Sequence, residues 1–132
     1  MKVVMKNIQA KKAWEILKAN PKAVLVDVRT PQEWAAVGFP DLSTLGREAV
    51  ALTWSAEEPE AFHQALDEAV PDKTASLFFL CRSGVRSHHA CESAFEAGYQ
   101  NTANIADGFE DRHGPGTGWR ASALPFILRP LS

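Results

Sequence analysis

The chain has 132 residues, enough for one domain with a buried core; 45% of them are apolar and 23% are charged. This composition excludes intrinsic disorder, and the net charge of -2 leaves no overall basic field for nucleic acid or an anionic membrane. The two cysteines, Cys81 and Cys91, are too few for a disulfide-rich secreted scaffold. We therefore expect one domain over residues 1–132, with neither nucleic acid nor a membrane as partner.

The first segment of the chain predicts a cytoplasmic protein. Lys2, Lys6 and Asn7 interrupt its apolar residues, so it lacks the apolar stretch of a signal peptide. No segment reaches the roughly 18 uninterrupted apolar residues that a membrane-spanning helix needs. In a reducing compartment both thiols are expected to stay free unless the chemistry of the protein uses them.

The first predicted elements are a helix and a buried strand. Trp14 and Leu17 recur at helical spacing within residues 12–19, and the Asn20-Pro21 pair that follows is a helix-ending signal. Residues 23–28 (AVLVDV) hold one charge among apolar side chains, which is typical of a strand buried on both faces of a parallel sheet.

A short helix and a further strand are predicted next. Thr30-Pro31 opens the helix, because proline is well tolerated in a first turn, and residues 38–41 break the chain into a loop. Residues 49–54 are a candidate second strand.

A longer amphipathic helix is predicted over residues 58–70. Its apolar residues form one stripe opposite its acidic residues. Its start has two solutions, because Ser55 and Glu58 suggest a capping box whereas Pro59 favours the first turn.

The second half of the chain continues the alternation of strands and helices. Residues 75–80 (ASLFFL) are the clearest strand, and the helix expected after the next loop contains Cys91 and ends at Gly98. Residues 102–105 form a last short strand, and the Gly- and Pro-rich tail from residue 108 is expected to wrap the domain as an ordered loop ending in a short helix. This order predicts an α/β fold in which helices flank a central parallel sheet of about five strands with right-handed crossovers.

The most informative segment is CRSGVR, Cys81 to Arg86, between a predicted strand and a predicted helix. In open α/β sheets, ligands bind at the carboxyl ends of the strands. A glycine-containing turn before a helix N-terminus presents backbone N–H groups that attract anions and favour a thiolate, and Arg82 and Arg86 add positive charge. Cys81 is therefore predicted to be a nucleophile; the alternative is a buried cysteine without chemistry at a strand end.

Several motifs resemble the rhodanese family, sulfurtransferases that carry sulfur as a cysteine persulfide. Residues 25–34 (LVDVRTPQEW) resemble its first motif, and residues 79–87 (FLCRSGVRS) resemble its catalytic motif. GFE near Gly108 and residues 118–126 (GWRASALPF) are similar to the closing segment of small bacterial single-domain members. Residues 38–42 (GFPDL) depart from the pattern, because many members have a Gly-His-Ile-Pro-Gly-Ala stretch there.

The resemblance implies a rhodanese-like three-layer domain and a sulfurtransferase with Cys81 as its catalytic residue. Cys81 takes a sulfane sulfur from a small donor such as thiosulfate and passes it to cyanide or a thiol; a protein donor or acceptor is also compatible. No metal or organic cofactor is required. The loop is expected to hold the bound anion and the terminal sulfur with backbone N–H groups, and its arginine side chains to contact the donor's anionic end. The expected substrate-binding residues are Arg82, Ser83, Gly84, Val85 and Arg86.

Two other functions stay open. Cysteine-dependent phosphatases place an arginine after five intervening residues, whereas four separate Cys81 from Arg86, and a smaller ring of donors suits a sulfur atom better than a phosphoryl group. Phosphatase or arsenate reductase activity is the enzymatic alternative. The other is a non-catalytic rhodanese-like module that binds a protein partner, against which the intact Cys81 argues.

Asp27 and Arg29 are expected to support the site rather than to react. Asp27 ends a buried strand, where an unpaired carboxylate is costly, so it should accept hydrogen bonds from the loop backbone or from an arginine. Arg29 is expected to pair with a carboxylate such as Glu33.

The remaining candidates are assigned to packing or to the surface. Cys91 lies on an apolar stripe and is expected to be a core residue rather than a resolving thiol. Two adjacent histidines, His88 and His89, cannot share one helical face, so no metal site is predicted; they are expected to be solvated or capping, with lining of the pocket as the alternative. Trp119 is expected in the core, with a cover over the active loop as the alternative.

Overall fold

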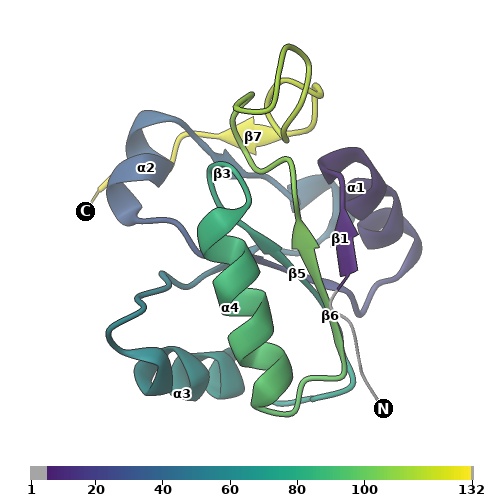
Figure 1. Ribbon diagram of the computed structural model, residues 1–132. Coiled ribbons are helices and arrows are strands. Elements are labelled where there is room, and N and C mark those ends of the chain that lie inside the picture. The colour runs from purple at the N-terminus through teal and green to yellow at the C-terminus, as the bar shows by residue number, and fades with distance from the viewer. Residues whose placement is uncertain (1–5, 132) are drawn as a thin grey trace.

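The computed structural model describes residues 6–131, which form the expected α/β fold with a central parallel sheet of five strands (Figure 1). The strand order is β1-β6-β5-β2-β4, and helices cover both faces. The strands of this sheet are β1 (Lys6–Ile8), β2 (Val24–Asp27), β4 (Val50–Ala51), β5 (Ser76–Leu80) and β6 (Asn101–Ile105). The helices are α1 (Ala10–Ala19), α2 (Pro31–Ala36), α3 (Pro59–Ala69) and α4 (Val85–Glu96), with a 3-10 turn at Ser43–Leu45. Among the described residues no helix is long and apolar enough to cross a membrane.

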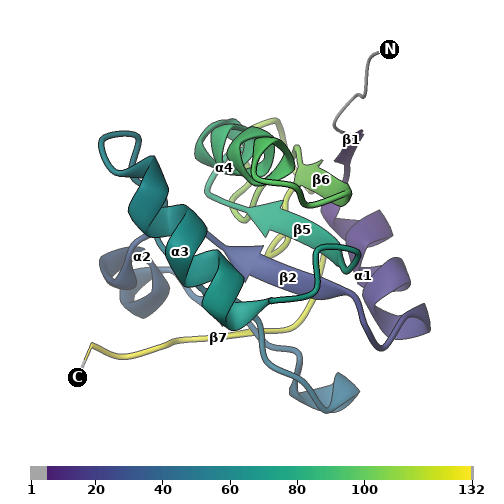
Figure 2. The same ribbon diagram turned by 90° about the horizontal axis from the view of Figure 1, so that it is seen from below.

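The sheet divides the core into two layers because successive strand residues point to opposite faces. Leu25 pairs with Phe78 and packs with α1, α2 and the tail, whereas Val26 pairs with Phe79 and packs with α3 and α4. Figure 2 shows the sheet between these two groups of helices. Burial on both faces explains why the central strands are continuous apolar runs rather than alternating ones.

The structure differs from the sequence-based expectation at two places in the sheet. The three-residue strand β1 at the sheet edge was not predicted, since two of its residues are exposed and carry no apolar pattern. The strand expected over residues 49–54 shrinks to the two residues of β4. Beyond them the chain still bonds to the end of β2, because the amides of Leu52 and Trp54 donate to Asp27 and Val28 at 3.0 Å each.

Of the two starts expected for helix α3, the structure shows the one with Pro59 in the first turn. Pro59 is the first helical residue, and Glu58 before it makes no capping bond. The Ser55 hydroxyl donates to Glu57 at 3.0 Å instead, so no capping box forms.

The prediction of a short helix at the end of the tail is wrong. Residues 119–123 form turns, and the chain continues into β7 (Phe126–Ile127), which pairs antiparallel with β3 (Phe39–Pro40). Pro125 disfavours helical conformation at the residue before it, and the Trp119 indole N–H donates to the Pro125 carbonyl at 2.7 Å. Extended pairing with a segment 86 positions earlier in the chain (Pro40 with Phe126) therefore replaces local helix formation.

The N-terminus of α1 is capped by a residue from the other end of the domain. Gln9, the residue before the helix, makes no side-chain capping bond. The Asp107 carboxylate accepts instead from the Ala10 amide at 2.8 Å and from the Gly118 amide at 3.0 Å. One buried side chain thus satisfies a helix end and attaches the tail to it.

We expect Asp107→Ala to lower the free energy of unfolding by about 1–2 kcal/mol, because it leaves the Ala10 and Gly118 amides without their acceptor. Urea denaturation measures the change. Asp111→Ala, at an exposed position four residues later, is the matched control and should unfold like the wild type. Equal stability of the two variants would contradict the capping role.

Candidate functional site

Cys81 follows directly on β5, at the carboxyl edge of the sheet. Its neighbour strand is β2, and the Val28 amide beyond β2 donates to the Leu80 carbonyl at 2.9 Å. The chain adds β4 on one side of β2 and then β5 on the other, so the order of strands reverses between them. Such reversal points are where open α/β sheets bind ligands.

Hydrogen-bond donors surround the Cys81 sulfur. The Gly84 amide lies 3.1 Å from Sγ and the Ser87 hydroxyl lies 3.2 Å from it. Helix α4 begins at Val85, so the positive end of its dipole faces the same atom. Cys81 itself is only 1% exposed, and this arrangement stabilises negative charge on a sulfur that little solvent reaches.

Two glycines allow the close backbone contacts that shape this loop. Gly84 has φ +98°, and a Cβ there would lie 2.4 Å from the Ala106 carbonyl oxygen. Gly108 has φ +71°, and a Cβ there would lie 2.3 Å from the Arg82 carbonyl oxygen. Any side chain at either position would push the segment after β6 away from the loop.

The segment after β6 holds the loop through hydrogen bonds to its carbonyl groups. The Phe109 amide donates to the Cys81 carbonyl at 2.9 Å, and the Glu110 amide donates to the Arg82 carbonyl at 3.1 Å. A ring nitrogen of His113 lies 2.7 Å from the Ser83 carbonyl oxygen. With its carbonyls bonded outward, the loop is held with the Gly84 amide directed at the sulfur.

The two arginines of the loop have different environments. Both terminal nitrogens of Arg86 donate to Glu33, at 2.7 and 2.9 Å, so its side chain is engaged in a two-bonded ion pair. The expectation that the Arg86 guanidinium contacts a donor is therefore not supported by its geometry. Arg82 is exposed, and among residues 6–131 no hydrogen bond or ion pair engages its guanidinium.

The prediction that Arg29 pairs with Glu33 is wrong, because Glu33 forms its ion pair with Arg86. Arg29 pairs with Asp27 instead, its Nε and Nη2 donating at 3.0 and 2.6 Å, and both side chains are fully buried. Of the two partners expected for Asp27, the structure thus shows the arginine. Arg29 also donates to the Gly38 carbonyl at 2.8 Å and stacks 4.0 Å above the ring of Phe109, the residue whose amide donates to the Cys81 carbonyl.

Cys91 lies in the core, as expected. It is fully buried against α3 and the sheet, and burial raises the pKa of its thiol to about 12 despite a hydrogen bond to Thr102. The structure therefore distinguishes the two thiols: Cys81 faces hydrogen-bond donors, whereas Cys91 packs among apolar side chains.

The other candidates do not bond to the Cys81 sulfur. His88 and His89 have their rings edge to face at 5.6 Å, and no group of three or more potential metal ligands occurs in the described chain. Trp119 is fully buried, edge-on to Trp14 at 5.8 Å, which confirms its place in the core.

Two residues near the sulfur received no role from the sequence. Ser87 is fully buried and Asn104 is 3% exposed, and the Ser87 hydroxyl lies 2.5 Å from Asn104 Oδ1. An amide side chain within the buried strand β6 is the sequence signal that could have identified Asn104, since buried polar groups require partners.

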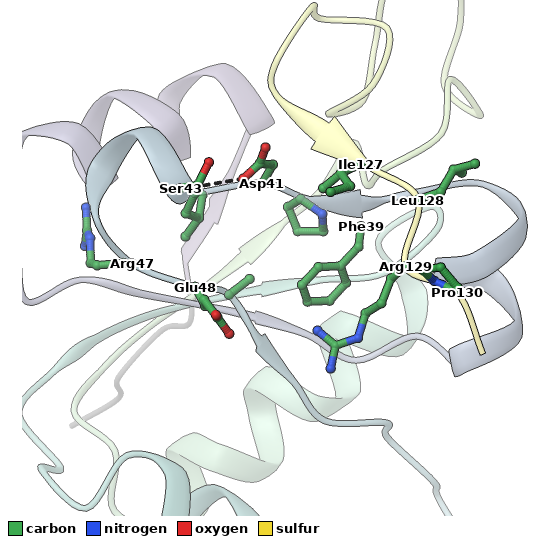
Figure 3. A pocket seen from close by; sticks show the side chains of 12 residues that line it. Phe39, Asp41, Ser43, Arg47, Glu48, Ile127, Leu128, Arg129 and Pro130 are labelled. Carbon is green, nitrogen blue, oxygen red and sulfur yellow. Dashed lines mark hydrogen bonds between the residues drawn. The ribbon is translucent and has the colours of Figure 1, made fainter. Parts of the chain in front are cut away.

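A separate cavity of about 350 Å³ lies beside β3 and β7 (Figure 3). Its lining comes from residues 39–43, 47–49 and 127–130, and none of it belongs to the Cys81 loop. The Arg129 guanidinium stacks 4.7 Å from the centre of the Phe39 ring. Neither cysteine lines this cavity, so it is separate from the candidate site at Cys81.

The fold and the site together define an α/β domain with a nearly enclosed thiol that faces hydrogen-bond donors at the carboxyl edge of a parallel sheet. The family model described as the STR4 middle domain matches residues 5–131, and the chain accordingly belongs to this rhodanese-like family.

The chain is similar over most of its length to several known proteins. It is 44% identical to the M. tuberculosis protein Rv0390, whose crystal structure superposes with a TM-score of 0.83 over 96% of this chain and 100% of that one. An uncharacterised protein of Rickettsia conorii is 40% identical, covering 92% of this chain and 97% of its own length. A mitochondrial Saccharomyces cerevisiae protein named thiosulfate sulfurtransferase is 36% identical over 63% of this chain and 55% of its own.

The Glu33–Arg86 pair gives stability a defined dependence on pH. Burial raises the pKa of Glu33, but hydrogen bonds from Arg86 and Thr30 outweigh it and lower the pKa from 4.5 to about 2. The ionised form is thus favoured by folding, so this contribution is complete above pH 4.5 and is lost as the pH falls through 2.

We expect the difference in unfolding free energy between wild type and Glu33→Gln to grow by about 2 kcal/mol from pH 2 to pH 4.5, the shift being reduced by partial exposure of the pair. Denaturation across this range measures it. Glu68→Gln, on the exposed face of α3, is the control and should change much less. A constant difference for Glu33→Gln would show that the pair does not lower its pKa.

Proposed function

We propose that this protein is a sulfurtransferase, which moves a sulfane sulfur from a donor such as thiosulfate to a thiophilic acceptor through a persulfide on Cys81. The observation that carries the proposal is the Cys81 sulfur, buried and facing the Gly84 amide and the Ser87 hydroxyl at the start of α4. The rhodanese-like family and the yeast relative named thiosulfate sulfurtransferase support it.

The reaction has two steps, and neither requires a metal or an organic cofactor. The Cys81 thiolate attacks the sulfane sulfur of thiosulfate; a bond forms between the two sulfur atoms, and the S–S bond of thiosulfate breaks with its electron pair leaving on sulfite. Cyanide or a thiolate then attacks the terminal sulfur of the persulfide. The bond from that sulfur to Sγ breaks, which regenerates the Cys81 thiolate.

The loop assists both steps through fixed hydrogen-bond donors. The negative charge of the persulfide lies on its terminal sulfur, within reach of the amides at the start of α4. Because the segment after β6 bonds to the carbonyls of the loop, these amides need no reorganisation when charge arrives.

Binding of an anionic donor falls to Arg82 rather than to Arg86. The Arg86 charge is neutralised by Glu33, whereas the Arg82 guanidinium is exposed and free to meet the sulfonate end of thiosulfate. This assigns the two loop arginines to different tasks: Arg86 anchors α4 to α2, and Arg82 attracts the donor.

Cys81 is expected to gain one sulfur atom when the protein is incubated with thiosulfate, and intact-mass spectrometry detects it. Cys81→Ser should gain none, while Cys91→Ala should load like the wild type because Cys91 lies in the core. If the wild-type protein gains no sulfur and forms no thiocyanate from cyanide, the proposal is wrong. Hydrolysis of an aryl phosphate that depends on Cys81 would establish the phosphatase alternative instead.

Arg82→Ala is expected to raise the KM for thiosulfate about five- to tenfold with little change in kcat, since it removes a charge-assisted contact to the donor. Steady-state kinetics with cyanide as acceptor measure both constants. Arg112→Ala, which removes another exposed arginine on the neighbouring segment, is the control. Equal KM values in the two variants would contradict the role of Arg82.

A further inference from the structure

The Ser87 hydroxyl lies between the reactive sulfur and an amide oxygen. Its Oγ is 3.2 Å from Cys81 Sγ and 2.5 Å from Asn104 Oδ1, and the side chain is fully buried. A hydroxyl has one hydrogen, so it can donate to only one of these two acceptors at a time.

The orientation of the Asn104 amide follows from its other contacts. Its Nδ2 donates to the Gly84 carbonyl and to Asn7 Oδ1, both at 3.1 Å. The Gly84 carbonyl can only accept, so the nitrogen must face it and the oxygen must face Ser87. Asn104 is 3% exposed, and little water competes for this oxygen.

The protonation state of Cys81 therefore determines to which of the two acceptors the Ser87 hydroxyl donates its hydrogen bond. In the thiol, the S–H donates to Ser87 Oγ and the hydroxyl donates to Asn104. In the thiolate, a charged acceptor competes with a neutral amide oxygen, and hydrogen bonds to charged groups are the stronger ones. Rotation about the Ser87 C–O bond moves the hydrogen to the sulfur without displacing any heavy atom.

We propose that Ser87 is a catalytic hydrogen-bond donor that follows the charge on the Cys81 sulfur, with Asn104 as its acceptor whenever Sγ is uncharged. The role of Ser87 during turnover rests on the proposed sulfurtransferase function, whereas its hydrogen bond to the thiolate does not. In the persulfide Sγ is neutral and the hydroxyl returns to Asn104. When the acceptor attacks the terminal sulfur, Sγ leaves as a thiolate and the hydroxyl donates to it. No proton is transferred in either step.

The test removes the hydroxyl and measures the thiolate directly. The rate of alkylation by iodoacetamide as a function of pH reports the thiolate without any sulfur transfer. We expect the midpoint of this profile to move upward by about one pH unit in Ser87→Ala, the value of one hydrogen bond to a charged group. Ser87→Thr keeps a hydroxyl at the same place and should retain the wild-type midpoint.

Ser93→Ala is the matched control on the same helix. The Ser93 hydroxyl bonds to His63 rather than to Cys81, so its removal should leave the midpoint unchanged. If Ser87→Ala fails to fold, Ser87→Val, which has the shape of Ser87→Thr without its hydroxyl, should show the same shift. An unchanged midpoint in the folded variant that lacks the hydroxyl overturns the proposal.

The discharge of the persulfide tests the role in turnover. Cyanide should discharge preloaded Ser87→Ala about threefold more slowly than wild type, because a more basic thiolate is a poorer leaving group. An equal discharge rate would overturn this part of the proposal. A shifted alkylation midpoint in a protein that never loads sulfur would support the hydrogen bond to the thiolate and overturn the sulfurtransferase function, so the two failures are distinguishable.

Discussion

The site depends on one constraint, the close approach of two backbone segments at the carboxyl edge of the sheet. The Cys81 loop and the segment after β6 lie so near each other that neither Gly84 nor Gly108 has room for a Cβ. This approach lets the amides of residues 109 and 110 bond to the carbonyls of the loop. The Gly84 amide then donates to the Cys81 sulfur. Helix α4 begins at the next residue, so the positive end of its dipole also faces this sulfur.

Most of the charged side chains near the Cys81 loop are paired with a side chain of opposite charge. Asp27 and Arg29 neutralise each other in a fully buried pair, and Glu33 neutralises Arg86 at the half-buried rim. What is left at the loop is the exposed guanidinium of Arg82 together with the partial charges of the backbone amides. A chain with a net charge of -2 can in this way present a local positive field to a small anion.

Much of the fold was predictable because apolar runs and helical stripes are local patterns. The strands β2 and β5, the helices α1, α3 and α4, and their alternation follow from such patterns with boundaries within a few residues. The strands β1, β3 and β7 have two or three residues each and exist only through pairing with distant segments, so no local pattern marks them. The helix expected in the tail failed for the same reason.

The sequence by itself determined the loop that surrounds Cys81 and predicted that this cysteine is a nucleophile, because a cysteine, a glycine turn and a helix start are contiguous in the chain. It also determined that Cys91 belongs to an apolar helix face. Only the tertiary structure decided the partners: that Asp27 holds Arg29, that Glu33 holds Arg86, and that Asn104 meets Ser87. These contacts join different elements across the sheet edge, and an ion pair or hydrogen bond is specified by distance in space, which spacing along the chain does not encode.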